Sequence, residues 1–302
     1  MQKIKAFIKA ARLRTLPLAI AGIVVGNACA YVAGVFSQEI CILTVVTALL
    51  LQILSNFAND YGDFVKGTDN DDRVGPERAM QSGAISKSEM QIALGFFTAL
   101  SLGFGIKLLR VALADATLAD FMFFLGLGII SIIAAITYTV GKKAYGYHGL
   151  GDVMVFIFFG LVSVVGAYYL QVKVFDVAVL LPAISVGLFS AGVLNMNNTR
   201  DIENDKASGK NTLPVRFGKN FAKTYQLLAI TIGIASSWFY LQFGIPSNYN
   251  WLYFLCLPIF FLSLRKMYNA KEDKEFDTVL KLTVLGTLIY GIIFCIISFN
   301  AQ

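Results

Sequence analysis

The sequence has little charge, almost no histidine and no paired cysteines. Only 15% of its 302 residues are charged, and the one histidine is His148. The four cysteines lie within or beside apolar stretches, and none belongs to a CxxC pair. This pattern predicts neither a zinc site nor a disulfide framework. The low charge also excludes an ordinary soluble domain, in which about a quarter of the residues are charged.

Apolar residues are abundant instead, at 57% of the sequence, and the mean hydropathy is +0.67. They form nine blocks of about the length that crosses a bilayer as a helix, which is roughly 20 residues. The blocks are residues 16–36, 40–57, 90–108, 119–140, 153–172, 176–196, 223–243, 249–264 and 279–299. We therefore predict an all-α polytopic membrane protein with nine transmembrane helices in a single domain over residues 1–302. The eighth block is short, and we expect Pro258 to kink or thin it.

The N-terminal segment is basic and precedes an apolar run, as in a secretory signal peptide. The run continues to Phe36 and eight further blocks follow, so we expect no cleavage. Within residues 2–12, Ile4, Phe7 and Ile8 share a helical face among lysines. This pattern predicts an interfacial helix lying on anionic membrane lipid. Gly22 and Gly26 have the GxxxG spacing of a close helix contact.

The distribution of basic residues predicts the orientation in the membrane. Of the 25 lysines and arginines, 22 fall in alternate loops on one side, and only Lys107, Arg110 and Lys173 fall on the other. The positive-inside rule therefore places the N-terminus in the cytosol and the C-terminus outside. The same rule explains the net charge of +6, so we expect no nucleic-acid partner.

Acidic residues gather just after the second and sixth blocks. In the first cluster, Asn59 and Asp63 lie four residues apart on one helical face, and Asn56 and Asp60 lie on an adjoining face. Because each cluster begins where a predicted helix enters the cytosol, we expect both at one end of the bundle. Their separation by four helices predicts a tandem repeat of helices 1–4 and 5–8, with helix 9 added.

In the second cluster, Asn197, Asp201 and Asp205 recur at intervals of four residues. Two facing ladders of amide and carboxylate oxygens would repel each other unless a cation lay between them. Oxygen ligands at few positions, with room for water and phosphate, are typical of Mg²⁺. The ladders therefore predict a magnesium site formed by Asn59, Asp63, Asp201 and Asp205.

Basic residues surround both clusters and favour a receptor for a metal–polyphosphate over a bare cation site. The alternative is that they are ordinary positive-inside residues beside helix-capping acids. As diphosphate-binding residues we predict Lys66, Arg73, Lys142, Lys143, Lys210 and Arg216. As catalytic residues we predict Asp63, Asp201, Asp205, Arg73 and Lys143.

At these residues the sequence resembles the UbiA superfamily of intramembrane prenyltransferases, whose two motifs read NDxxDxxxD and DxxxD. The first matches from Asn59 to Asp63, and the second from Asp201 to Asp205. The last aspartate of the first motif would fall at Gly67, but this chain has Asp69 two residues later. The resemblance implies a nine-helix fold, a site with two Mg²⁺ ions in which Asp69 is a further ligand, and a polyprenyl diphosphate donor.

Several segments are similar to the menaquinone branch of that superfamily, which prenylates 1,4-dihydroxy-2-naphthoate. They are residues 12–17, 63–67, 72–76, 146–152 and 197–201. The resemblance implies prenyl transfer to this aromatic acid with loss of carbon dioxide, giving demethylmenaquinone. We expect the acceptor to contact Arg14, Tyr138, Asn197 and Asn198, and the guanidinium of Arg14 suits a carboxylate. The implied location is the inner (plasma) membrane, with the multi-pass chain presenting its active site to the cytosol.

Other interpretations remain open at this point. The acceptor can be another aromatic acid such as 4-hydroxybenzoate, or the chain can be an ion-coupled secondary transporter. Transporters place acids near the midplane, whereas these apolar blocks contain almost none. A phosphotransferase for CDP-activated lipids would carry one compact Asp motif, which the chain lacks.

The roles of two single residues also stay open. His148 is either a general base or a turn residue, and Asp152 either orients the acceptor or caps a helix. Residues 271–277 have mixed charge and predict a solvated linker.

Overall fold

The structure is a computed structural model that describes residues 2–70, 73–245 and 247–301. Every regular element in these ranges is a helix, and they contain no strand. Nine helices of the described part are long and apolar enough to cross a membrane, which confirms the predicted all-α fold and the number of spans. Asp71 and Asp72, which contribute to the first acidic cluster, lie outside the described residues.

The α-helices have the following bounds: α1 Gln2–Ala10, α2 Leu16–Val32, α3 Gln38–Val65, α4 Lys87–Ala112, α5 Leu118–Thr137, α6 Gly151–Val155, α7 Gly166–Val172, α8 Leu180–Arg200, α9 Ile202–Ala207, α10 Leu213–Gly244, α11 Leu257–Asn269 and α12 Phe276–Phe299. A π-helical stretch, Phe156–Val165, joins α6 to α7 in one span. Gly218, at a φ of 83°, interrupts the first part of α10.

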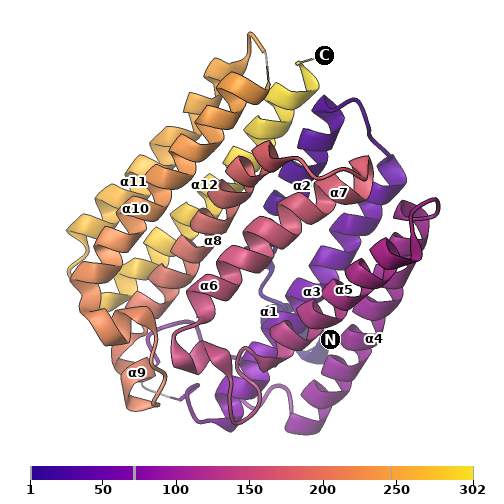
Figure 1. Cartoon of the computed structure of the whole chain (residues 1–302). Coiled ribbons are helices and arrows are strands. Elements are labelled where there is room, and N and C mark those ends of the chain that lie inside the picture. The colour runs from indigo at the N-terminus through magenta and orange to yellow at the C-terminus, as the bar shows by residue number, and fades with distance from the viewer. Residues whose placement is uncertain (1, 71–72, 246, 302) are drawn as a thin grey trace.

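The long helices form one bundle, with α9 and the connections that follow α3, α5 and α8 gathered at its lower end in Figure 1. At the centre, α8 packs against α10, α12 and the π-helical stretch, and α12 also packs against α2. By contrast, few residues of α4 and α5 are buried inside the described structure, as in lipid-facing helices. The tandem repeat and the orientation in the membrane stay predictions.

Two glycines of α2 allow the π-helical stretch to approach its backbone. A Cβ atom on Gly22 would lie 1.9 Å from Ser163 Oγ, and one on Gly26 would lie 2.3 Å from the carbonyl oxygen of Val164. Any larger side chain would push the two helices apart. The GxxxG spacing therefore marks a real helix contact, since small residues let backbones pack closely in membrane bundles.

Some helix ends differ from the hydropathy blocks. The second block ends at residue 57, but α3 continues to Val65, so its last turns carry the whole Asn59–Asp63 segment. In the eighth span a 3₁₀ helix, Asn250–Cys256, precedes α11, and Pro258 lies in the first turn of α11. A proline at this point needs no N–H partner, so it starts the helix where we had expected a kink.

The N-terminal helix α1 is separate from α2, because Arg12 adopts a left-handed conformation with a φ of 51°. Ile4 and Ile8 are exposed, whereas Phe7 packs against Phe57 of α3. One face of α1 is therefore anchored on the bundle and the other is open. Its contact with membrane lipid stays a prediction.

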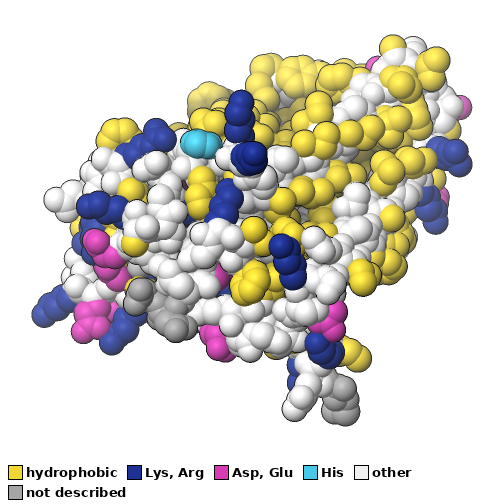
Figure 2. All heavy atoms as spheres, turned by 90° about the horizontal axis from the view of Figure 1, so that it is seen from below, with side chains coloured by type: hydrophobic (Ala, Val, Ile, Leu, Met, Phe, Trp, Pro, Cys, Tyr) yellow, Lys and Arg dark blue, Asp and Glu magenta, His cyan; other side chains and the backbone are white. Residues whose placement is uncertain are grey.

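Figure 2 shows the molecule from below, with lysine, arginine and acidic side chains spread over this end. Hydrophobic side chains are densest toward the upper right of the same view. The molecule thus presents one polar end built from the loops that the sequence analysis assigned to the cytosol.

Candidate functional site

A cavity of about 370 Å³ runs from the polar end of the bundle into its apolar interior. The interior part is lined by apolar side chains of α2, α4, α5, α8 and the π-helical stretch. The polar part is lined by Arg12, Arg14, Asn59, Asp63, Thr68, Arg73, Arg78, Tyr138, Asn197, Asp201, Asp205 and Lys210. A charged mouth that leads to an apolar interior suits a ligand with an anionic head and a hydrocarbon tail.

The end of α3 contributes Asn56, Asn59 and Asp63 to the cavity lining. Asn59 and Asp63 line the cavity, while Asp60 is buried on the adjoining face and pairs with Arg12. Asn56 shares that face and donates to the carbonyl oxygen of Ala11 at 2.8 Å. Asn56 and Asp60 therefore hold the N-terminal segment, and Asn56 also borders the cavity beside Asn59 and Asp63.

Asp69 does not line the cavity, contrary to its expected role as a metal ligand. Its Oδ1 lies 3.1 Å from Arg73 Nε and 3.9 Å from Arg78 Nε, and both arginines do line the cavity. Burial raises the pKa of Asp69 to about 6, with a contribution from Asp63, although the two arginines oppose the shift. Burial and nearby Arg12 lower the pKa of Arg78 to about 9. Asp69 therefore holds, from outside the cavity, two arginines that line it.

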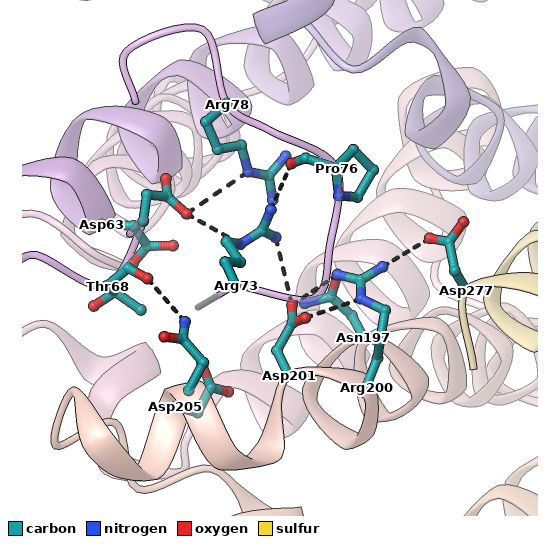
Figure 3. A network of polar contacts seen from close by, with 12 residues as sticks. Asp63, Thr68, Arg73, Pro76, Arg78, Asn197, Arg200, Asp201, Asp205 and Asp277 are labelled. Atoms are coloured by element: carbon teal, nitrogen blue, oxygen red, sulfur yellow. Dashed lines mark hydrogen bonds and ion pairs between the residues drawn. The ribbon is translucent and has the colours of Figure 1, made fainter. Parts of the chain in front are cut away.

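Asp201 lies at the break between α8 and α9 and is held by two arginines. Its carboxylate accepts from Arg200 Nε at 2.9 Å and from Arg200 Nη2 at 2.7 Å, and Arg73 Nη2 lies 3.4 Å away (Figure 3). Arg200 is itself buried and donates to Asp277 at 2.8 Å. Burial alone would raise the pKa of Asp201, but the hydrogen bonds and charge of Arg200 lower it below the ordinary value.

Lys210 lies between the two acidic clusters. Its Nζ is 3.8 Å from Asp63 Oδ2 and 3.7 Å from Asp205 Oδ1, and its side chain is only 7% exposed. Burial would lower the pKa of Lys210, but these two carboxylates raise it overall. Burial raises the pKa of Asp205 to about 7, and its buried Oδ2 has no hydrogen-bond partner within the described part of the chain. Asp205 therefore offers a carboxylate oxygen that accepts no hydrogen bond from the described residues, and Asp63 contacts the same ammonium group.

The described residues contain no group of three His, Cys, Asp or Glu side chains close enough to enclose a metal ion. Arg73 and Lys210 stand between the carboxylates in this arrangement. The residues nevertheless fit Mg²⁺, because the donors are oxygens and Asp205 Oδ2 lacks a partner. Few protein ligands beside basic groups suit a metal that arrives with phosphate oxygens.

Other predicted diphosphate-binding residues lie outside the cavity. Lys142 and Lys143 are exposed in the turn after α5, where their ammonium groups remain in water, so the structure gives Lys143 no catalytic position. Arg216 donates to the carbonyl oxygen of His148 at 2.8 Å. Lys66 Nζ lies 3.7 Å from the centre of the Tyr147 ring. Only Arg73 and Lys210 of this predicted set face the cavity.

Three of the four predicted acceptor-binding residues line the cavity, namely Arg14, Tyr138 and Asn197. Arg14 Nη1 lies 3.5 Å from Asp277 Oδ1, and Asn197 Oδ1 accepts from Arg200. Asn198 is buried but does not line the cavity, because it points to a different face of α8. Of these four, Asn198 therefore has no place in the site.

The residues left open by the sequence also fall outside the cavity. His148 is exposed in the 3₁₀ turn Tyr145–His148, which agrees with a turn residue. Asp152 is buried in the first turn of α6, where its side chain bonds Tyr225 and its own backbone N–H. Neither position reaches the cavity, so neither residue has a contact that would assign it a chemical role.

Sequence reasoning missed several residues that build the site. Asp277 was predicted to lie in a solvated linker, but it is half-buried at the start of α12 and binds Arg200, Arg14 and Lys281. Arg200 was counted only as a nearby cation. In the sequence, Arg200 could have been singled out by its position next to Asp201. Asp277 could have been singled out as an acid directly before an apolar block. Thr68 had no such signal, and Arg12 and Tyr147 were marked only as members of the similar segments 12–17 and 146–152.

Comparisons with known proteins agree with this geometry. A model of the UbiA prenyltransferase family matches residues 19–285. The chain is 43% identical to the 1,4-dihydroxy-2-naphthoate octaprenyltransferase of Escherichia coli K12, covering 100% of this chain and 97% of that protein. It is 36% identical to the enzyme of the same name from Mycobacterium tuberculosis, covering 97% and 96%.

Solved structures show the same fold. A UbiA homologue from Aeropyrum pernix K1 superposes with a TM-score of 0.67 at 19% identity, covering 91% of this chain and 96% of that one. A UbiA homologue from Archaeoglobus fulgidus, solved with GPP and Mg²⁺, gives a TM-score of 0.54 at 19% identity, covering 94% and 99%. At these identities the likeness concerns the arrangement of helices alone.

Proposed function

The chain belongs to the UbiA prenyltransferase family, and from this premise we propose that it transfers a polyprenyl chain from polyprenyl diphosphate to 1,4-dihydroxy-2-naphthoate. The observation that carries the proposal is the cavity, whose charged mouth joins an apolar interior. Two relatives of this chain are named for the same naphthoate acceptor. The ring keeps its two hydroxyls during transfer, so the product is demethylmenaquinone in its reduced form.

Magnesium fits the proposed site through the oxygens of Asn59, Asp63, Asp201 and Asp205, and we propose two ions. The metal, when bound, neutralises charge on the diphosphate and so favours its departure. The Archaeoglobus fulgidus homologue was solved with Mg²⁺ and a prenyl diphosphate, which supports this choice of ion. Asp69 is left out of the ligand set because it lies outside the cavity, where it pairs with Arg73 and Arg78 of the cavity lining.

Arg73 and Lys210 provide the basic groups for the diphosphate, since both line the cavity between the acids. A planar guanidinium binds two phosphate oxygens at once, and the ammonium serves as a point charge. The allylic carbon–oxygen bond breaks, and its electron pair stays on the diphosphate. Charge that is already in place at the mouth of the cavity stabilises this leaving group.

The prenyl chain occupies the apolar interior. Burial of each CH₂ group contributes about 0.8 kcal/mol, so a polyprenyl tail binds strongly to such a surface. The same side chains exclude water from the allylic cation. The naphthoate carbon that bears the carboxylate attacks this cation. The bond to the carboxylate then breaks, its electron pair returns to the ring, and carbon dioxide leaves.

Arg14 is the residue that we propose for the acceptor carboxylate. It lines the cavity, and among the described residues its only ion pair is the 3.5 Å contact with Asp277, so its guanidinium retains donors for a second carboxylate. Tyr138 and Asn197 line the same region.

We also propose that the polar end of the bundle faces the cytosol from the inner (plasma) membrane, because it carries the basic loops.

The proposed reaction is tested by offering 1,4-dihydroxy-2-naphthoate and 4-hydroxybenzoate in parallel to purified protein with one polyprenyl diphosphate and Mg²⁺. We expect a prenylated naphthalene diol, diphosphate and carbon dioxide from the first acceptor. A carboxylated product from the benzoate alone would contradict the naphthoate assignment and favour the other aromatic acceptor. If neither acceptor elicits magnesium-dependent release of diphosphate, the enzyme proposal is wrong and a transporter is favoured.

A further inference from the structure

Tyr147, in the loop after α5, contacts the first acidic cluster through its hydroxyl and the loop after α9 through its backbone. Its hydroxyl donates to Asp63 Oδ1 at 2.7 Å and lies 2.5 Å from Thr68 Oγ1. Because an ionised carboxylate only accepts, the hydrogen bonds run from Thr68 to Tyr147 and from Tyr147 to Asp63. The carbonyl oxygen of Tyr147 accepts from the backbone N–H of Asn211 at 3.0 Å. One residue thus touches α3, the loop after it and the loop after α9.

The partners of Tyr147 are themselves fixed. The carbonyl oxygen of Thr68 accepts from Asn204 Nδ2 of α9 at 2.8 Å, a bond drawn in Figure 3, and its N–H donates to the carbonyl oxygen of Asp63. With its amide oriented to satisfy both neighbours, Asn59 donates to Asp63 Oδ2 at 2.7 Å and accepts from Arg12 Nη1 at 3.1 Å. Both carboxylate oxygens of Asp63 are therefore oriented by donors of the chain.

We propose that Tyr147 is a positioning residue that orients Asp63 for a divalent cation, an inference that rests on the proposed function. Donors that hold a ligating carboxylate stop it from turning away, and their removal typically costs 10- to 100-fold in metal affinity or activity. Tyr147 is well suited because it is buried and its ring is fixed under Lys66 Nζ at 3.7 Å. Replacement by phenylalanine keeps the ring and removes the hydroxyl alone.

The test compares Tyr147→Phe with Tyr253→Phe, a matched loss of a buried hydroxyl outside the cavity. The hydroxyl of Tyr253 donates to the carbonyl oxygen of Ile234 at 2.9 Å. Binding of Mn²⁺ is followed by electron paramagnetic resonance in the presence of inorganic diphosphate, and the Mg²⁺ dependence of turnover is measured separately. We expect Tyr147→Phe to raise both half-saturating metal concentrations about tenfold or more. Its kcat at saturating Mg²⁺ should stay within about threefold of the wild type, and Tyr253→Phe should change neither quantity.

Thr68→Val is a second variant that keeps the inference testable if Tyr147→Phe folds poorly. It removes the donor to Tyr147, so it should shift metal binding in the same direction by a smaller factor. Unchanged metal binding in both variants, or a loss of kcat without a shift in half-saturation, would overturn the positioning role. A wild-type protein that neither binds Mn²⁺ nor transfers a prenyl group would instead contradict the proposed function.

Discussion

The carboxylates at the ends of α8 and α3 are held in different ways. Asp201 accepts two hydrogen bonds from Arg200, which in turn binds Asp277, and the pKa of Asp201 lies below its ordinary value. Asp63 and Asp205 share the single ammonium group of Lys210 at 3.7–3.8 Å, and Asp205 keeps an unpartnered oxygen. Asp201 is thus already neutralised by the chain, whereas the other two acids share one ammonium group between them.

This difference indicates that one region of the site stabilises the bundle and the other binds the cation. The paired region around Arg200 is an internal strut that joins α8 to α12. The underpaired region around Lys210 is where an added cation would gain the most, because buried like charges raise each other's pKa and favour a positive partner. The following predictions test whether the two regions differ in this way.

The largest effect should come from breaking the paired region with Arg200→Met. The variant leaves Asp201 and Asp277 without their shared guanidinium, so the free energy of unfolding should fall by about 3–5 kcal/mol. Lys281→Met removes another partner of Asp277, but the lysine side chain is 60% exposed. Its effect should stay below about 1 kcal/mol. Reversible unfolding in micelles measures both, and equal losses would show that Arg200 is no strut.

In the underpaired region, Asp63→Asn and Asp205→Asn should each lower kcat about 10²- to 10³-fold with little change in folding. Each variant removes charge that is needed to hold the metal with its diphosphate. The control is Asp273→Asn, since Asp273 pairs with Lys219 at 2.6 Å outside the cavity. Prenyl transfer under saturating substrates is the measurement. A similar loss at Asp273, or none at the two site residues, would remove the basis for a metal site.

Metal binding should depend on pH through Asp205, whose pKa is about 7. Below that pH the carboxylate is protonated, so the half-saturating Mg²⁺ concentration should fall about tenfold per pH unit up to pH 7 and level off above it. Because this folded-state pKa is raised above the unfolded value, metal-free protein should lose stability as pH rises from about 4 to 7. Asp205→Asn should flatten both profiles, and an unchanged profile in this variant would assign the titration elsewhere.

The smallest effect should follow Lys143→Ala, because this side chain is exposed and lies outside the cavity. We expect a change in the Michaelis constant for the prenyl diphosphate of less than about twofold, as for a screened surface charge. Lys210→Ala, the matched change inside the cavity, should raise that constant at least about tenfold, as loss of a charge-assisted contact does. The reverse order in steady-state kinetics would mean that the loop after α5 supplies the diphosphate-binding lysine.

Features that depend on local pattern could be predicted from the sequence. The nine spans follow from apolar length, and the cavity-facing pair Asn59 and Asp63 follows from helical periodicity. The two-ladder pattern also placed Asn197, Asp201 and Asp205 at one cavity, even though α8 ends at Arg200. These outcomes need only the spacing of side chains along a helix.

Features that depend on loop conformation could not be predicted. Asp69 lies outside the cavity and pairs with Arg73 and Arg78. The hydroxyl of Tyr147 donates to Asp63, which is 84 residues away in the sequence. Neither contact follows from helical periodicity. Although Tyr147 lies in the similar segment 146–152, the packing of its turn decides which side chain it meets. Asp277 was misassigned for the same reason, since a charged segment looks solvated until its partner on another helix is known.

The most direct test of the central claim is a comparison of the Tm of purified wild-type protein with Mg²⁺ alone, with inorganic diphosphate alone and with both. The account predicts a small shift with either ligand and a much larger one with both, since the acids need the metal and the basic groups need the phosphate. Asp205→Asn should lose this synergy. A full shift with diphosphate alone, unchanged by Mg²⁺ and by Asp205→Asn, would contradict a joint metal–diphosphate site.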